Sequence, residues 1–174
     1  RAAMVKVLGD FSAYFGGSYT RLSIQKLVYF LQTFSVGFNL EFSKADYGPY
    51  SRELHSALRV MEKQNYLMGY VDDKEISVRA SAYAAAEEYL TNSSSQLAPV
   101  FEKLSHLVEG FESPFGMELL SSVHYLHDVE GYVSLSDIAG GICNWNQEKR
   151  DKFDFVQIEA AVGRLIEDGL IVEV

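Results

Sequence analysis

The sequence has 174 residues, of which 48% are hydrophobic and 22% charged, so it can bury one large core or two small ones. Its single cysteine, Cys143, excludes a disulfide framework, and no apolar run approaches the roughly 20 residues of a membrane-spanning helix. These features favour a cytoplasmic protein in a reducing compartment. Because the chain begins with Arg1 and not with Met, we expect a piece of a longer protein.

The net charge of −9 is unevenly distributed along the chain. Residues 1–80 contain 10 Lys and Arg against 8 Asp and Glu, a balance of +2, whereas residues 81–174 contain 5 against 16, a balance of −11. An acidic surface repels phosphate backbones and attracts basic grooves. The alternative interpretation is that the acidic residues only keep the protein soluble.

The first part of the chain predicts helices that alternate with short strands. In chain order the expected elements are helix 4–15 ended by Gly16-Gly17, a helix capped by Ser23, strand 40–44, a helix from Ser51 to about residue 65, strands 67–71 and 75–79 across the turn Asp72-Asp73, and helix 82–90. Helix, strand, helix and hairpin is the order of a winged-helix unit.

The polar run 91–95 predicts a boundary, after which the chain is mostly helical. The expected elements are helix 96–108, a helix that begins at Ser113-Pro114, a helix start at Ser134 with Asp137 at capping-box spacing, a last helix from Asp154 or Phe155 to Gly169, and strand 170–174. The predicted fold class is mainly α with short β hairpins. Two winged-helix-like halves, 1–90 and 96–174, are expected to pack together.

The segment Asp46-Tyr47-Gly48-Pro49-Tyr50 is more than a simple chain reversal requires. Gly48 relieves backbone crowding and Pro49 fixes φ, so the two tyrosines are held at set angles. Rigid tyrosines lose little entropy on contact, which favours recognition. Gln25, Lys26, Tyr29 and Phe30, in the preceding helix, are expected to be core and helix-face positions.

No motif in the sequence indicates catalysis. The glycine pairs lack the context of a phosphate-binding loop, and Cys143 has no histidine in a local motif. His124 and His127 stand at i, i+3, but no third ligand of recognisable spacing accompanies them. We therefore expect no enzymatic activity, no cofactor and no bound metal.

Six segments resemble the C-terminal domain of the DarG antitoxins, the partners of the DarT toxins. They are QKLVYFLQ, ADYGPYSREL, NYLMGYVDD, EGFESPFGMELLSSVHYL, NWNQEKRDKF and IEAAVGRLIEDGLI, and together they cover Thr20 to Ile171. The resemblance implies a domain that binds and silences a DNA ADP-ribosyltransferase toxin by covering its DNA-binding surface. It also implies fusion to a preceding macrodomain, an ADP-ribose-removing unit to which nothing in this chain is similar.

With this resemblance, we expect acidic and aromatic side chains to imitate single-stranded DNA on the toxin, with no membrane and no nucleic acid bound directly. The expected partner-binding residues are Asp46, Tyr47, Tyr50, Glu53, Tyr70, Asp72 and Asp73. Two alternatives stay open: a winged-helix DNA-binding transcriptional regulator, and a domain that holds two copies together through the turn tyrosines. The regulator has electrostatics against it, because the segment from Asp154 to Gly169 carries one arginine against four acidic residues.

Overall fold

The computed structural model describes residues 1–15, 19–34, 37–90 and 98–172. In chain order the elements are α1 (Ala2–Phe15), α2 (Arg21–Thr33), β1 (Ser43–Ala45), β2 (Gly48–Tyr50), α3 (Arg52–Lys63), β3 (Leu67–Met68), β4 (Ser77–Val78), α4 (Ala80–Tyr89), α5 (Ala98–Val108), α6 (Pro114–Asp128), α7 (Leu135–Trp145), α8 (Gln147–Lys152) and α9 (Phe155–Glu167). The prediction of a mainly helical fold with short hairpins is confirmed.

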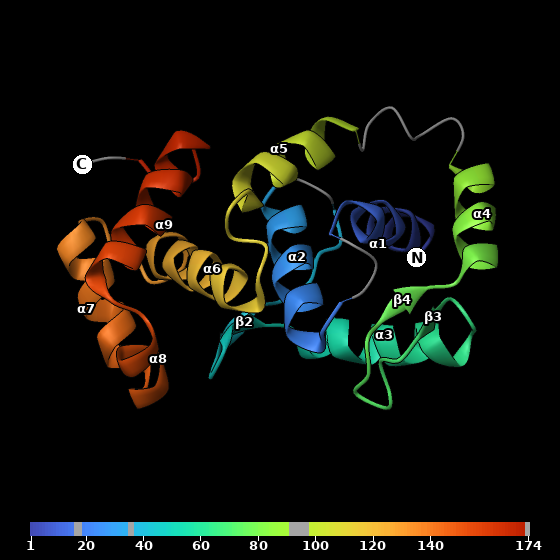
Figure 1. Ribbon diagram of the computed structural model, residues 1–174, viewed down its shortest axis with the longest axis horizontal. Coiled ribbons are helices and arrows are strands. Elements are labelled where there is room, and N and C mark those ends of the chain that lie inside the picture. Colours follow the sequence, from blue (N-terminus) through green and yellow to red (C-terminus); the bar gives the residue numbers. More distant parts are fainter. Residues whose placement is uncertain (16–18, 35–36, 91–97, 173–174) are drawn as a thin grey trace.

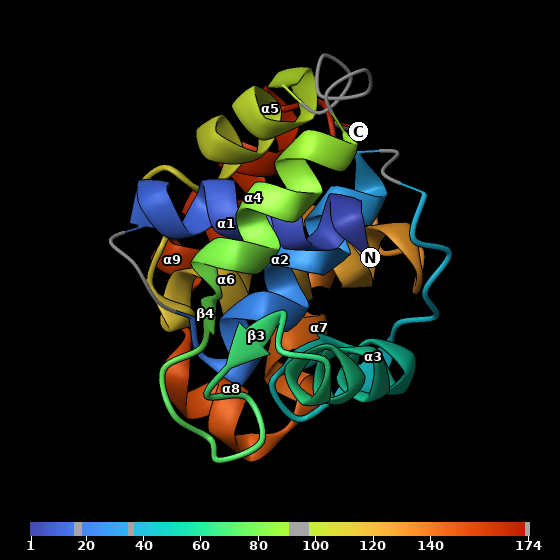
Figure 2. The ribbon, with the colours of Figure 1, turned by 90° about the vertical axis from the view of Figure 1, so that its right-hand side faces the viewer.

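The helices α2 and α6 pack against each other in the middle of the molecule, as Figure 1 shows. The helices α7, α8 and α9 gather on one side of this pair, and α1, α3 and α4 lie on the other (Figure 1). Figure 2 looks onto that second side, where α1 and α4 lie in front of α2. Helices from the first and the second part of the chain therefore meet along the α2–α6 contact.

The two central helices are buried on most of their surface because neighbours surround them. In α2 every residue from Ile24 to Leu31 is buried, and in α6 every residue from Gly116 to Leu126. The buried apolar side chains form one cluster that runs from α1 to Ile171. Because this core is continuous across both parts of the chain, we expect it to fold cooperatively.

Two short antiparallel hairpins interrupt the helices. Strands β1 and β2 pair with Ala45 opposite Gly48, which leaves Asp46 and Tyr47 as the two turn residues. Strands β3 and β4 pair with Leu67 opposite Val78. Among the described residues, no helix is long and apolar enough to cross a membrane.

Several predicted boundaries hold because their signals are local. Ser51, Ser113 and Ser134 each accept a hydrogen bond from the backbone amide three residues ahead, and thus cap α3, α6 and α7. Asp154 caps α9 in a reciprocal capping box with Gln157. The predicted helix end at Gly16-Gly17 and the predicted boundary at 91–95 lie outside the described residues.

The predicted cap of α2 was wrong. Thr20 has the extended backbone of an N-cap and accepts from the Ser23 amide, so that α2 begins at Arg21. Ser23 instead occupies the third helical position and accepts from the Thr20 amide (2.9 Å). Threonine and serine are both favourable N-cap residues, and the extended backbone at Thr20 makes that residue the N-cap.

Four predicted strands also differ from the structure, and the one expected over 75–79 is reduced to Ser77–Val78. The strand predicted over 40–44 begins at Ser43, because the Gln32 side chain binds both the amide and the carbonyl of Leu40, each at 2.7 Å. Strand β3 ends at Met68, because the Glu62 carboxylate accepts from the amides of Gly69 and Val71. The strand predicted over 170–174 is absent from its described part, where the Leu170 and Ile171 amides both turn back to Leu165 O.

Candidate functional site

The inner face of the β1–β2 hairpin is fixed to α2 by two polar side chains. Lys26 Nζ donates to Pro49 O (2.7 Å), while the Gln25 amide donates to Ser51 O (3.1 Å) and accepts from Ser51 N (2.9 Å). We call Gln25 and Lys26, with the Pro49 and Ser51 backbone, the turn clamp. Gln25 and Lys26 are at most 1% exposed, as the sequence led us to expect of core positions. Their bonds hold the hairpin and the cap of α3 at a fixed place on the core.

Gly48 is required at this turn for two reasons. Its φ of +96° lies in the region that favours glycine, and an added Cβ would lie 2.8 Å from Ser122 Oγ and 3.3 Å from Lys26 Nζ. Burial, and then repulsion by Lys149, lower the pKa of Lys26 to about 7, although the Glu118 carboxylate opposes the change. The packing around Gly48 is therefore tight, polar and closed to solvent.

A buried ion cluster, formed by Glu118, Lys149 and Lys152, lies near Lys26. The Glu118 carboxylate, 4% exposed, accepts from Lys149 through Oε1 and from Lys152 through Oε2 (2.7 Å). Burial lowers the pKa of Lys149, and its hydrogen bond to Glu118 raises it again. Because both carboxylate oxygens are occupied, Glu118 serves structure and is not a free acid or base.

The outer face of the hairpin opens onto a pocket with a volume of about 350 Å³. We call this the aromatic pocket, and its walls are Thr20, Arg21, Leu22, Tyr47, Tyr50, His55, Tyr70 and Asp73. The lining comes from the start of α2, the β1–β2 hairpin, α3 and the β3–β4 connection. Four separate segments of the first part of the chain thus converge on one concave surface.

The rings of the aromatic pocket follow one another at contact distance. Tyr50 and His55 have centroids 6.3 Å apart, and His55 and Tyr70 have centroids 5.6 Å apart. His55 Nδ1 and the Tyr70 hydroxyl lie 2.7 Å apart in a hydrogen bond, and the Arg21 guanidinium lies 5.3 Å from the centre of the Tyr70 ring. Tyr70 is 1% exposed, whereas Tyr47 is 41% exposed at the hairpin tip. The pocket has a fixed floor and one accessible aromatic at its edge.

Arginines from α2 and α3 act on the titratable side chains of this pocket. Burial raises the pKa of Tyr50, and the positive charges of Arg21 and Arg52 oppose this rise. Burial lowers the pKa of His55, and Arg59 and Arg21 lower it further. Arg52, His55 and Arg59 follow at i, i+3 and i+7, so one face of α3 carries all three. Arg21 lines the pocket itself, whereas Arg52 and Arg59 lie next to it on α3.

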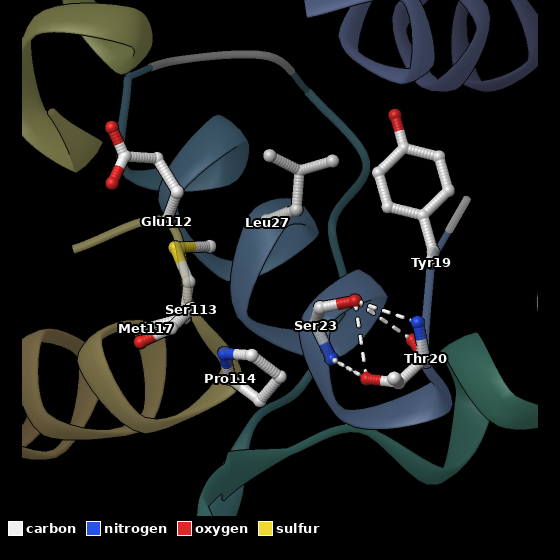
Figure 3. A pocket seen from close by; sticks show the side chains of 8 residues that line it. All are labelled: Tyr19, Thr20, Ser23, Leu27, Glu112, Ser113, Pro114 and Met117. Atoms are coloured by element: carbon white, nitrogen blue, oxygen red, sulfur yellow. Dashed lines mark hydrogen bonds between the residues drawn. The ribbon is translucent and has the colours of Figure 1, made fainter. Parts of the chain in front are cut away.

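A second pocket, about 250 Å³ in volume, lies between the start of α2 and the start of α6 (Figure 3). Its lining residues are Tyr19, Thr20, Ser23, Leu27, Glu112, Ser113, Pro114 and Met117. Its polar groups already serve helix ends: Thr20 and Ser23 bond to each other, and Ser113 accepts from the Gly116 amide. The Tyr19 hydroxyl donates to Leu8 O and the Glu112 carboxylate accepts from the Gly110 amide, while Leu27 and Met117 form the apolar part of the wall.

The structure brings together four of the seven residues that the sequence predicted as a contact surface. Tyr47, Tyr50, Tyr70 and Asp73 line the aromatic pocket, whereas Asp46, Glu53 and Asp72 are exposed and do not line it. The acidic members are partly neutralised. Asp73 is 3.2 Å from the Arg21 guanidinium, and Asp72 is 3.8 Å from Lys74.

Sequence reasoning missed Arg21 and His55 as members of this pocket. Arg21 donates to the carbonyls of Tyr70 and Val71, about 50 residues further along the chain, and no local pattern reveals such a contact. His55 did have a signal, because its spacing from Arg52 and Arg59 places all three on one helix face.

The histidines on α6 are used within the fold. His124 Nδ1 lies 2.7 Å from the Tyr29 hydroxyl, and His127 Nδ1 donates to Tyr132 O (2.8 Å). Burial lowers the pKa of His124 to about 4. In the part of the chain that the structure describes, no three His, Cys, Asp or Glu side chains are grouped to hold a metal ion.

Fold and pocket together describe a mainly helical chain with an aromatic, arginine-bearing pocket. No protein-family model matches it. The chain is 31% identical to a protein of Thermus aquaticus named DNA ADP-ribosyl glycohydrolase, over 173 residues that make up 98% of the chain and 47% of the relative. Proteins of the same name from Mycobacterium bovis and Mycobacterium tuberculosis are each 28% identical over 156 residues, which cover 84% of the chain and 44% of the relative. The chain thus spans about half the length of the curated relatives it matches.

These relatives correct the functional expectations. Their name is that of an enzyme, so the expectation of a DarG-type antitoxin domain without catalytic activity is wrong. The expected inhibition of an ADP-ribosyltransferase, the alternative of a transcriptional regulator and the prediction of no enzymatic role are contradicted in the same way. The expectation rested on a resemblance of fold-building segments, and a fold by itself does not define an activity. A preceding macrodomain and a toxin partner are not tested by these findings and stay predictions.

Proposed function

We propose that this chain acts within a DNA ADP-ribosyl glycohydrolase, as a part of an enzyme that releases ADP-ribose from DNA. The observation that carries the proposal is the match along 98% of the chain to a protein of that name. An alignment of this length leaves no part of the fold unaccounted for. An enzyme acting on bacterial DNA would work in the cytoplasm, which is where we place this chain.

The aromatic pocket supports this function through its chemistry. A nucleic acid presents flat bases and negative phosphates, and the pocket presents aromatic rings next to arginines. The part of the chain with this pocket has a balance of +2, so the acidic excess lies elsewhere in the sequence. Charge and ring geometry both fit a DNA substrate.

A glycohydrolase adds water across a glycosidic bond, so that the sugar carbon gains the water oxygen and the leaving group takes a proton. Enzymes commonly use two carboxylic groups for this reaction. Among the described residues, the two pockets above contain one carboxylate each, Asp73 and Glu112. The geometry therefore supports holding the DNA more directly than cleaving the bond.

The test is hydrolysis by the protein in its full natural length. An oligonucleotide that carries ADP-ribose on one base is incubated with the protein, and free ADP-ribose is measured by chromatography. We expect free ADP-ribose and the unmodified oligonucleotide in equal amounts. Intact modified DNA after prolonged incubation with folded protein would refute the proposed function. The 174-residue chain is assayed in parallel, because release by it would place the catalytic groups within this chain.

A further inference from the structure

A third pocket, about 350 Å³ in volume, lies between the last turns of α2 and α6 and shares no lining residue with the aromatic pocket. Its walls are Tyr29, Gln32, Thr33, Phe42, Tyr125, Asp128 and Val129. This set contains three aromatic rings, one carboxylate and no lysine or arginine. Proteins enclose organic ammonium ions with aromatic rings, because the negative ring faces attract a cation.

The walls of the third pocket are held in place by contacts within the fold. Tyr29 and Phe42 have ring centroids 5.2 Å apart and planes at 76°, so the two rings form a corner. Tyr29 is 6% exposed, and its hydroxyl lies 2.7 Å from His124 Nδ1. The Gln32 side chain binds both backbone groups of Leu40, which ties the segment before Phe42 to α2. Rigid walls reduce the entropy lost when a ligand binds.

The charge of the third pocket is negative. Asp128 is exposed at the end of α6, and in the part of the chain that the structure describes its carboxylate has no ion pair and no hydrogen bond. Burial, and then the charges of Asp128 and Tyr125, raise the pKa of Tyr29, which therefore stays neutral. Because α2 ends at Thr33 and α6 ends at Asp128, both helices bring the negative ends of their dipoles to this pocket.

Lysines behind Tyr125 do not cancel this negative charge. The Tyr125 ring lies 5.8 Å from the Trp145 ring, which Lys44 Nζ approaches to 4.4 Å. Lys44 is itself paired with the Glu130 carboxylate at 2.8 Å. Lys149, 5.0 Å from the same ring, belongs to the buried ion cluster. The Asp128 carboxylate is therefore available to a cation that enters from solvent.

The polar groups of the third pocket indicate which kind of ammonium ion it suits. Gln32 and the Tyr29 hydroxyl are occupied as described, and Thr33 Oγ1 donates to Tyr29 O (3.1 Å). A primary ammonium has three N–H donors to satisfy, whereas a quaternary ammonium has none and needs only rings and a nearby negative charge. Val129, 56% exposed, adds an apolar surface for methyl groups.

We propose that the third pocket binds a small quaternary ammonium ion of the choline type. The trimethylammonium group lies among the rings of Tyr29, Phe42 and Tyr125, and the Asp128 carboxylate supplies the opposite charge. The volume of the pocket is at the lower end of the range for small-ligand sites, which suits choline itself. Such an ion is neither substrate nor product of the proposed function, so this site is an additional one and does not rest on that function.

The experiment follows amide chemical shifts of the chain by NMR while choline chloride replaces potassium chloride at constant ionic strength. We expect saturable shifts at millimolar choline, concentrated in the last turns of α2 and α6. Neohexyl alcohol, the neutral carbon isostere of choline, should bind at least about tenfold more weakly, because it has the shape without the charge. Butylammonium, a primary amine, should also bind more weakly than choline.

Two variants separate charge from ring contacts. D128N removes the charge at an exposed helix end, so the fold is retained, and choline binding should weaken by about tenfold. The matched control is D46N, which changes an exposed aspartate outside this pocket and should leave binding unchanged. F42L removes one ring and keeps an apolar side chain, and it should weaken choline binding by about fivefold.

The proposal is overturned if choline causes no saturable shifts in the last turns of α2 and α6, or if neohexyl alcohol or butylammonium binds as tightly as choline. It is also overturned if D128N and D46N have the same effect on choline binding. None of these measurements involves the release of ADP-ribose. The site and the proposed function can therefore fail separately.

Discussion

The two faces of the β1–β2 hairpin differ in almost every physical property. On the inner face, Gly48 and Pro49 are buried, and Lys26 and Gln25 occupy the backbone groups around them. On the outer face, Tyr47 and Tyr50 border an open pocket. The same short segment is thus anchored to the core on one side and borders an open pocket on the other. A sequence motif of this kind is conspicuous for its anchor, while its ligand chemistry comes from residues far away in the chain.

The comparison also explains why the tyrosines are well suited to binding. The turn clamp fixes the hairpin through three hydrogen bonds from α2, so the outer tyrosines are positioned before a ligand arrives. Positioning in advance reduces the entropy lost on binding. The following predictions test whether the inner face determines stability and the outer face does not.

The largest effect is expected from G48A. Alanine at φ +96° is strained, and its Cβ would lie 2.8 Å from Ser122 Oγ in a buried, tightly packed region. We expect a loss of about 3 kcal/mol or more in the free energy of unfolding, measured by urea denaturation.

The matched control for this variant is G140A in α7. No atom lies within 4 Å of a Cβ built at Gly140, and its φ is in the ordinary range. We expect no loss, and up to about 1 kcal/mol of gain from the higher helix propensity of alanine. Equal destabilisation by both variants would mean that the inner face of the hairpin is not specially constrained.

The second effect is expected from Q25L. This variant leaves both the amide and the carbonyl of Ser51 buried without their partner. We expect a loss of about 2–4 kcal/mol in the free energy of unfolding. Q64L is the control, since Gln64 is exposed at the end of α3, and it should change stability by less than about 0.5 kcal/mol. A neutral Q25L would show that water replaces the clamp.

The third effect is a pH dependence that originates at Lys26. Its folded pKa of about 7 is below the unfolded value of 10.5, so the unfolded state binds more protons between these two values. Stability should therefore rise with pH across this window by about 1 kcal/mol per pH unit from this group alone, and should be insensitive to it below pH 7.

K26M isolates this contribution. Methionine fills a similar volume and has no charge, so the unfolding free energy of the parent should rise relative to that of K26M as pH rises from 7 to 10.5. Urea denaturation of both proteins at several pH values measures it. A difference that stays constant with pH would mean that Lys26 is charged in the fold throughout.

Which features the sequence could predict depended on the range of the interactions involved. The caps at Ser51, Ser113 and Asp154 were predictable because donor and acceptor lie three residues apart. The later start of β1 could not be predicted, because the Leu40 backbone is hydrogen-bonded to the Gln32 side chain of the preceding helix. Hydrophobic periodicity carries no information on such contacts.

The candidate site shows the same limit. The turn tyrosines were identified from Gly48 and Pro49, whose backbone restrictions are visible in one line of sequence. The charges near these tyrosines could not be predicted from the sequence. They depend on the contact of Arg21 with the β3–β4 connection and on which face of α3 carries Arg52 and Arg59. The acidic interpretation used totals over 94 residues, whereas the pocket is surrounded by the more basic part of the chain.

The smallest effect on stability, and the one that separates the two faces, is expected from Y47A. Tyr47 is 41% exposed at the turn, and its truncation leaves the turn clamp in place. The unfolding free energy should change by less than about 0.5 kcal/mol. Urea denaturation of Y47A and of the parent chain measures this difference. If Y47A destabilised the free protein as much as Q25L, the outer tyrosine would belong to the anchor and the two faces would not be separable.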